Sequence, residues 1–205
     1  MTDQSPAAQW DQRYGTEDYW YGTQPNDFLK EHVGALPPRG RVLCLAEGEG
    51  RNAVFLATHG FDVVAVDASA VGLAKAERLA RERQVSISIV QADLSNYALG
   101  HDAWDAIVSI WCHLPPALRA RVHRDVGPAL RAGGVFLLEA YTPAQLEFKT
   151  GGPPTAELMP TLAGLRAELS GLEFGFAIER ERDVHEGHGH DGRSAVVQVI
   201  ARRPS

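Results

Sequence analysis

The chain has 205 residues, of which 44% are hydrophobic and 22% charged, and its formal net charge is −6. This composition is that of a globular protein with one domain, and the acidic balance argues against a nucleic-acid partner, which usually requires a basic face. No apolar run approaches the ~18–20 residues of a membrane span, so we expect no membrane partner. Cys44 and Cys112 form no CxxC pair, which argues against a disulfide framework or a structural zinc site.

Residues 1–24 are polar but rich in aromatic side chains. Their start has neither a basic region nor an apolar core, so it does not look like a signal peptide, and we expect a cytoplasmic protein. Disordered tails usually lack aromatic residues, and this segment carries Trp10, Tyr14, Tyr19, Trp20 and Tyr21. We therefore favour a lid over a ligand pocket, with Arg13, Tyr14 and Tyr21 as candidate substrate contacts. The alternative is a mobile tail whose rings lie on the surface.

A helix is expected between this segment and the first strand. Asn26 or Asp27 is a suitable N-cap, and apolar residues follow on one edge. The helix ends at Leu36-Pro37-Pro38, so residues 1–36 form the lid and one helix.

Residues 41–69 are the unit around which the chain is organised. An apolar strand ends at Leu45, a turn with Gly48 and Gly50 follows, and after a short helix a second apolar strand ends at Asp67. The glycines let the backbone pass close to a ligand, and the helix that follows points free N–H groups at the same place. Asp67 is placed to accept hydrogen bonds from a ribose diol. The unit therefore predicts a nucleoside site.

The identity of the nucleoside is left open by this unit. Gly48-x-Gly50-x-x-Ala53 fits the dinucleotide fingerprint, with the acid 17 residues beyond Gly50. A dinucleotide and S-adenosylmethionine are both compatible with such a turn, so the rest of the chain must decide.

Strands and helices continue to alternate through Tyr141. A helix capped by Ser69 runs through Gln84 and is followed by a third strand, a fourth strand, a helix and a fifth strand. The expected segments are Val85–Ile89 ahead of Asp93, Asp105–His113, the helix after Pro115-Pro116, the turn at Gly133-Gly134, and Val135–Tyr141. This alternation implies a parallel sheet that is covered on both faces.

The pattern changes at Thr142. Leucines from 158 to 172 mark one helix, and two alternating strands follow, Phe174–Val184 and Ser194–Arg203. Ten residues from His185 join these strands, which is short enough to make them antiparallel. A nicotinamide-binding domain does not usually close in this way. We expect one domain, 1–205, in which 41–141 is the cofactor-binding core and 142–205 adds a substrate-side helix and a closing hairpin.

Together these motifs resemble the class I S-adenosylmethionine-dependent methyltransferases. They are most similar to the small bacterial group that includes the tellurite-resistance and thiopurine methyltransferase-like enzymes. The resemblance covers roughly residues 10–203 and rests on Leu43–Asn52, Val64–Ser69, Ala92-Asp93-Leu94, Asp105–His113, the Gly133-Gly134 turn and the terminal hairpin. It implies an α/β, doubly wound, Rossmann-like sheet of seven strands, mostly parallel with a terminal antiparallel hairpin. It also implies S-adenosylmethionine as cofactor and a small-molecule acceptor, such as a thiol or a chalcogen oxyanion.

The resemblance also implies roles for individual residues in cofactor binding. Gly48 and Gly50 would pass under the methionine part, Asp67 would hold the ribose with Ala68 beside the adenine, Asp93 and Leu94 would contact the adenine, and Ile110 and Trp111 would flank the methyl group. The first motif departs from the family pattern Leu-Asp-Leu-Gly-Cys-Gly-x-Gly. Cys44 replaces the acid, and Glu47 becomes our candidate to hold the ammonium group, with Asn52 closing the motif.

His113 is the leading candidate for contact with the acceptor. It lies at the tip of strand four, where ligands of open α/β sheets bind, and it could orient the nucleophile or take its proton. The alternative is a histidine that hydrogen-bonds the lid and does no chemistry. In the segment 185–193, His190 and Arg193 could grip an oxyanion, because strand six should end on the ligand side. The alternative is a polar loop, and we expect no metal there.

Two other functions stay open from the sequence. One is a small NAD(P)-binding oxidoreductase, which the fingerprint match favours and the closing hairpin disfavours. The other is a non-catalytic nucleoside-binding sensor, which the altered first motif allows. We expect a monomer or a homodimer with a small molecule as its partner.

Overall fold

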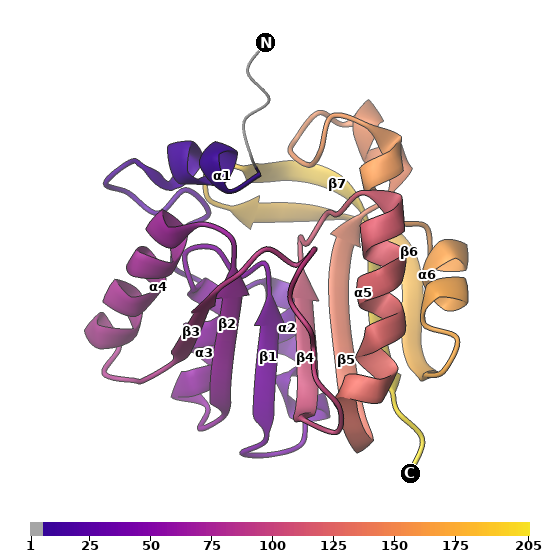
Figure 1. Ribbon diagram of the computed structural model, residues 1–205. Coiled ribbons are helices and arrows are strands. Elements are labelled where there is room, and N and C mark those ends of the chain that lie inside the picture. The colour runs from indigo at the N-terminus through magenta and orange to yellow at the C-terminus, as the bar shows by residue number, and fades with distance from the viewer. Residues whose placement is uncertain (1–5) are drawn as a thin grey trace.

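The computed structural model describes residues 6–205 and shows a single seven-stranded sheet (Figure 1). The strands lie in the order β3-β2-β1-β4-β5-β7-β6. Their bounds are β1 Arg41–Leu45, β2 Asp62–Asp67, β3 Ser88–Gln91, β4 Trp104–Ile110, β5 Leu130–Tyr141, β6 Glu173–Glu186 and β7 His190–Arg202. The strands β1 to β5 pair in parallel, whereas β7 is antiparallel to both of its neighbours. The expected fold class is therefore confirmed.

Helices cover both faces of the sheet. In Figure 1, α5 lies in front of the strands and α2 and α3 lie behind them. The helices are α1 Pro6–Tyr14, α2 Asp27–His32, α3 Arg51–Thr58, α4 Ala70–Glu82, α5 Pro116–Ala129 and α6 Leu162–Glu168, with short 3₁₀ turns η1 Val33–Ala35, η2 Pro143–Glu147 and η3 Ala156–Leu158. None of the helices within residues 6–205 is long and apolar enough to cross a membrane.

Strand β1 shows how the two apolar layers are built. Successive side chains of a strand point to opposite faces. Leu43 and Leu45 join the layer that contains apolar residues of α5, and Val42 and Cys44 join the layer that contains those of α2 and α3. All four are buried. A strand buried on both faces belongs in the centre of a parallel sheet, which fixes the position of the turn that follows it.

The carboxyl ends of the parallel strands meet at one edge of the sheet. Because β7 reverses direction, β6 ends and β7 begins at this same edge. The end of the β6–β7 hairpin bends across the top of the sheet, close to α1 (Figure 1). There the backbone N–H of His188 donates to the carbonyl of Trp20 over 2.8 Å. The hairpin and the N-terminal segment thus meet above the edge where ligands of such sheets bind.

The hairpin is longer than the sequence indicated. Pairing continues through His185 with Asp191 and Glu186 with His190, so three residues join the strands and not ten. Histidines, acids and glycines looked like a loop, but the polar side chains alternate along the strands and pair across them. His185 Nδ1 lies 2.7 Å from Asp191 Oδ1, and Gly187 adopts the positive φ of +67° that the turn requires.

Three other boundaries differ from expectation, the first of them because of a proline. The helix expected over 158–172 is helical only at Leu162–Glu168, because Pro160 disfavours helix at Met159 and lacks an N–H of its own. The third strand begins at Ser88 and not at Val85. The glycines expected to turn before strand five lie within β5 itself.

Candidate functional site at the carboxyl edge of the sheet

Asp67 closes the turn that follows β1. Its Oδ2 accepts from the N–H of Gly48 and its Oδ1 from the N–H of Ser69, each over 2.8 Å. Burial raises the pKa of this carboxyl, and the bonds from Ser69 and Gly48 oppose the rise. Each carboxylate oxygen can accept more than one hydrogen bond. Asp67 thus joins the first two strand ends and keeps capacity to accept from a ligand.

Gly48 and Gly50 are required by close approach as well as by conformation. Their φ angles are +61° and +88°. A Cβ on Gly50 would lie 2.4 Å from the Cβ of Ala76. The glycine therefore lets the beginning of α3 pack closely against α4. A Cβ on Gly48 would lie 2.5 Å from the hydroxyl of Tyr14. The backbone at Gly48 is therefore covered by a side chain from α1.

Glu47 caps the helix that follows the turn. Its Oε1 accepts from the N–H groups of Asn52 and Ala53 over 2.9 and 2.8 Å. Burial raises the pKa of this carboxyl to about 7, although the N–H donors and Arg51 oppose the rise. We expected these helix N–H groups to be free for a ligand, and that expectation is wrong at these two positions. The substitution of glutamate in the first motif explains it, because the side chain reaches its own helix.

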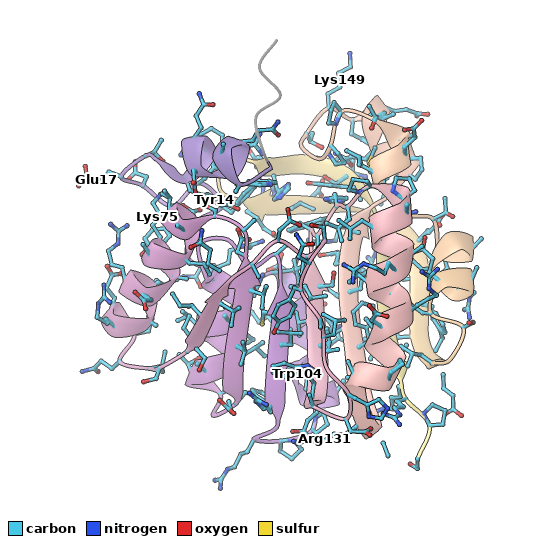
Figure 2. All side chains as sticks on the ribbon, viewed as in Figure 1. Tyr14, Glu17, Lys75, Trp104, Arg131 and Lys149 are labelled. Atoms are coloured by element: carbon cyan, nitrogen blue, oxygen red, sulfur yellow. The ribbon has the colours of Figure 1, made fainter. Side chains whose placement is uncertain are left out.

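Helix α1 lies over the glycine turn. Tyr14 is 5% exposed, and a Cβ on Gly72 would meet its ring at 2.9 Å. Asp11 Oδ1 accepts from the hydroxyl of Ser69 over 2.5 Å, which fastens α1 to the beginning of α4. Figure 2 shows Tyr14 directly below α1 at the top of the sheet. The segment predicted to be a lid therefore contains a helix, and this helix covers the turn at Gly48.

A buried ion pair fastens the next part of the N-terminal segment. Glu49, from the turn itself, pairs with Lys75 of α4 over 2.8 Å, and both side chains are buried. Glu49 Oε2 also accepts from the N–H of Tyr21, and Lys75 donates to the carbonyl of Asp18 over 2.6 Å. In Figure 2, Lys75 lies on α4 in the region of Tyr14. Residues 11–21 are thus held to the turn from two sides.

Five rings gather at the tips of β4, β5 and β7. This ring cluster consists of Tyr21, Trp111, His113, Tyr141 and His190. The Trp111 ring lies 4.4 Å from Tyr141 and 4.9 Å from His190, and Tyr21 stacks on His190 at 4.6 Å. Trp111 has a φ of +56°, an uncommon backbone conformation for a bulky residue. The sequence candidates Tyr21, Trp111, His113 and His190 are therefore brought together, and Tyr141 joins them.

Both histidines of the ring cluster are held neutral. Burial lowers the pKa of His113 to about 4 and that of His190 to about 3. His113 Nε2 accepts from the backbone N–H of Tyr141 over 3.1 Å, and His190 Nδ1 lies 2.7 Å from the Tyr141 hydroxyl. Because its Nε2 already accepts a hydrogen bond from the backbone, His113 is better placed to orient the rings of the cluster than to take a proton.

A buried charge network lies beside the ring cluster, and sequence reasoning missed it. Its members are Asn26, Arg51, Glu139, Arg182, Glu186 and Gln198. Glu186 accepts from Trp111 Nε1 over 2.6 Å and from Arg51. Glu139 is fully buried and pairs with Arg182 over 2.8 Å. The available signal was Glu139 itself, a carboxylate inside an otherwise apolar strand, because such a buried charge needs a partner.

The remaining cofactor candidates lie along the same edge. Ala68 is partly exposed, and Leu94 and Ile110 are buried. Asp93 is exposed and its carboxylate accepts from the N–H of Ser95 over 2.7 Å. Ala68, after β2, and Asp93, after β3, are therefore accessible to solvent at this edge of the sheet.

The two arginine candidates differ in position. Arg13 is exposed, donates to the Tyr21 hydroxyl over 3.1 Å and lies 4.9 Å from the ring of Trp10. Arg193 is exposed and pairs with Glu181 over 3.1 Å. Strand alternation places it on the opposite side of β7 from His190, so it is not brought to the ring cluster. Within residues 6–205, no group of three or more His, Cys, Asp or Glu side chains is arranged to hold a metal ion.

Comparisons with known proteins agree with this architecture. Residues 42–134 match the family model described as "Methyltransferase domain". No curated protein sequence matches the chain.

Several solved structures share the fold. One is the structure from work on the conversion of a disulfide bond into a thioacetal group during echinomycin biosynthesis. It is 17% identical to this chain with a TM-score of 0.77, and the match covers 97% of this chain and 91% of that one. A SAM-dependent methyltransferase from Methanosarcina mazei is 18% identical with a TM-score of 0.69, over 84% and 96%. TehB from Haemophilus influenzae is 19% identical with a TM-score of 0.69, over 96% and 66%. At these identities the likeness shows the fold.

Proposed function

We propose that the chain transfers the methyl group of S-adenosylmethionine to a small-molecule acceptor, because residues 42–134 match the model of a methyltransferase domain. Solved proteins of the same fold from Methanosarcina mazei and Mesorhizobium loti are described as S-adenosylmethionine-dependent methyltransferases. The observation that best supports a cofactor site at this edge is the carboxylate of Asp67, which is buried at the end of β2 and accepts a hydrogen bond from Gly48 in the turn. The antiparallel β7 weighs against the nicotinamide alternative.

The residues of the carboxyl edge fit a nucleoside with a charged amino-acid tail. Asp67 would accept from the ribose hydroxyls, and the bare backbone at Gly48 and Gly50 would lie against the methionine part. Ala68, Asp93 and Leu94 would border the adenine, with Ile110 and Trp111 beside the methyl group. Glu47 and Asn52, which close the first motif, would act by holding the turn in shape. When bound, the cofactor supplies an electrophilic methyl group on a sulfonium.

The N-terminal segment must take part in cofactor binding. Tyr14 contacts the same backbone at Gly48 that the cofactor would approach. The cofactor therefore either displaces this phenol or packs against it. Arg13 and Tyr21, on the same segment, would then border the acceptor.

The ring cluster defines the acceptor side. Methyl transfer is an in-line displacement, and alignment alone can be worth up to ~7–11 kcal/mol. With His113 neutral and its Nε2 engaged, a nucleophile that is already ionised or strongly polarisable suits this edge better than one that needs a base. A thiol or a chalcogen oxyanion has these properties. His190, whose ring stacks on Tyr21, would border such an acceptor.

Two measurements test the proposal. Calorimetry should show that S-adenosylmethionine and its demethylated product bind, and that NAD binds far more weakly. A product assay with thiol, tellurite and phenol panels should give methylated thiol or tellurium species. Tighter binding of NAD would restore the oxidoreductase, and cofactor binding without product from any panel would support the sensor.

A further inference from the structure

Glu186 occupies a position that fold stability alone does not explain. Its side chain is buried, and it bonds to three other parts of the chain, at Asn26, Arg51 and Trp111, as well as to Arg182 of its own strand. A buried ion pair is often no more stable than well-packed apolar residues of the same volume. We propose that Glu186 is a positioning residue, which fixes the indole of Trp111 relative to the glycine turn and so aligns the acceptor with the methyl group. The proposal rests on the proposed function for its chemical consequence.

The contacts of Glu186 divide between its two oxygens. Oε2 accepts from Trp111 Nε1 over 2.6 Å and from the guanidinium of Arg51. Oε1 accepts from Asn26 Nδ2 over 2.8 Å, and Arg182 Nη2 lies 3.4 Å away. Burial raises the pKa of this carboxyl, but Arg51 and the indole N–H more than offset it, so the pKa lies below its usual value. The carboxylate is therefore ionised and acts as an acceptor only.

Trp111 needs such a partner because its other contacts do not fix its orientation. It follows β4 with a positive φ, and its ring is flanked by Tyr141 and His190. Stacked rings tolerate sliding and rotation in their plane, whereas an N–H bond to a carboxylate is directional. The bond to Glu186 is thus the contact that sets the in-plane position of the indole.

Arg51 supplies the reference point. It is the first residue of α3 and follows Gly50 directly, so its backbone is part of the cofactor turn. Its guanidinium reaches Glu186, and Glu186 reaches Trp111. The indole is therefore located with respect to the turn through two charge-assisted bonds. A displacement of about 1 Å at a reacting centre can cost roughly 100-fold in rate.

The test compares Glu186→Gln with the matched control Glu139→Gln. Glu139 belongs to the same network and is fully buried, but its side-chain bonds go to Asn26, Arg182 and Gln198. We expect Glu186→Gln to lower kcat by roughly 10- to 100-fold with the affinity for the demethylated cofactor changed less than about threefold. It should also shift the indole N–H resonance that Trp111→Phe removes from the ¹H–¹⁵N spectrum. Glu139→Gln should lower stability but keep kcat and that resonance.

Each outcome decides the matter. Unchanged kcat in Glu186→Gln, or an equal loss of kcat in both variants, overturns the positioning role. If Glu186→Gln does not fold, Trp111→Phe carries the test, because it keeps a ring and removes the donor; unchanged kcat there overturns the proposal. A wild-type protein that makes no methylated product contradicts the proposed function instead, and the resonance in Glu186→Gln then decides whether Glu186 orients Trp111.

Discussion

The two halves of the carboxyl edge are built from different kinds of contact. Around the glycine turn, backbone N–H groups meet side chains that lie near in sequence: Asp67 bonds to Gly48, 19 residues away, and to Ser69, two residues away. Around the ring cluster, side chains meet across the whole chain. Glu186 bonds to Trp111 over a separation of 75 residues, and to Asn26 over 160. We call the region around the glycine turn, proposed to hold the nucleoside, the nucleoside half, and the region around the ring cluster, proposed to border the acceptor, the acceptor half. The bonds of Asp67 within the nucleoside half are shorter in range than those of Glu186 in the acceptor half, although α1 also reaches the turn from far away in the sequence.

The halves also differ in their electrostatics. In the nucleoside half, burial raises the pKa of Glu47 to about 7, so an acid tends to stay protonated. In the acceptor half, burial lowers the pKa of His113 and His190, so two bases tend to stay unprotonated. Both shifts follow from desolvation, which disfavours the charged form. Because one group is an acid and the others are bases, the same cause gives stability changes of opposite sign with pH.

The largest effect should come from the carboxylate that joins the two strand ends. Asp67→Ala removes the group proposed to accept from the ribose, and hydrogen bonds to a charged group contribute about 1.5–3 kcal/mol each. We expect cofactor affinity to fall by about 100-fold or more, measured by calorimetry, while circular dichroism shows the fold intact. Asp93→Ala, at the exposed tip after β3, is the control and should lose much less. Near-native affinity in Asp67→Ala would remove the ribose assignment.

The next effect tests how rigidly the turn is packed. Gly50→Ala forces a left-handed residue to carry a Cβ 2.4 Å from that of Ala76. We expect the free energy of unfolding to fall by about 2–4 kcal/mol in urea. Gly133→Ala has a similar φ of +72°, and apart from Gly133 and its two chain neighbours no atom of residues 6–205 lies within 4 Å of its added Cβ, so it should show the smaller backbone cost alone. If both variants lost the same free energy of unfolding, α3 and α4 would be able to move apart and accommodate the added Cβ.

The pH dependence of stability should separate the halves. For Glu47, the folded pKa lies above the unfolded one, so the folded state binds more protons between about pH 4.5 and 7, and its contribution to stability falls as pH rises. For His113 and His190 the folded pKa lies below the unfolded one. The unfolded state then binds more protons between about pH 4 and 6.5, and stability rises with pH.

Variants should remove these slopes one at a time. Glu47→Gln should make the free energy of unfolding rise more steeply between pH 4.5 and 7 than it does in the wild type, by about 1–3 kcal/mol over that window. His190→Gln should make it rise less steeply below pH 6.5. Urea unfolding at a series of pH values measures both, and parallel profiles for the wild type and both variants would contradict the assignment.

The smallest effect should come from outside both halves. Arg193 pairs with Glu181 on the exposed side of the hairpin, and such pairs contribute about 0–1 kcal/mol. Arg193→Ala should therefore leave kcat and the KM for the acceptor unchanged and stability nearly so. A large increase in KM would return Arg193 to the acceptor site and extend that half across β7.

The same difference decides what could be predicted from the sequence. Alternating periodicity and the spacing of Gly48, Gly50 and Asp67 indicated the sheet and the turn that Asp67 closes, because each of these patterns lies within a short stretch of sequence. The part played by Glu186 could not be predicted, since it depends on the register of a hairpin whose tip looked like a loop. The bonds of Glu47 to its own helix N–H groups could not be predicted either, because they depend on the path of its side chain and not on the motif.

The hairpin that bends over the edge has a consequence for the order of assembly. Trp111 and Arg51 leave the ribosome long before Glu186, so the indole stays unanchored while the nucleoside turn and the first four strands are already synthesised. A nascent chain could therefore acquire affinity for its methyl donor before it gains catalytic competence. Trapping stalled translation intermediates of increasing length would show these two properties appearing at different chain lengths.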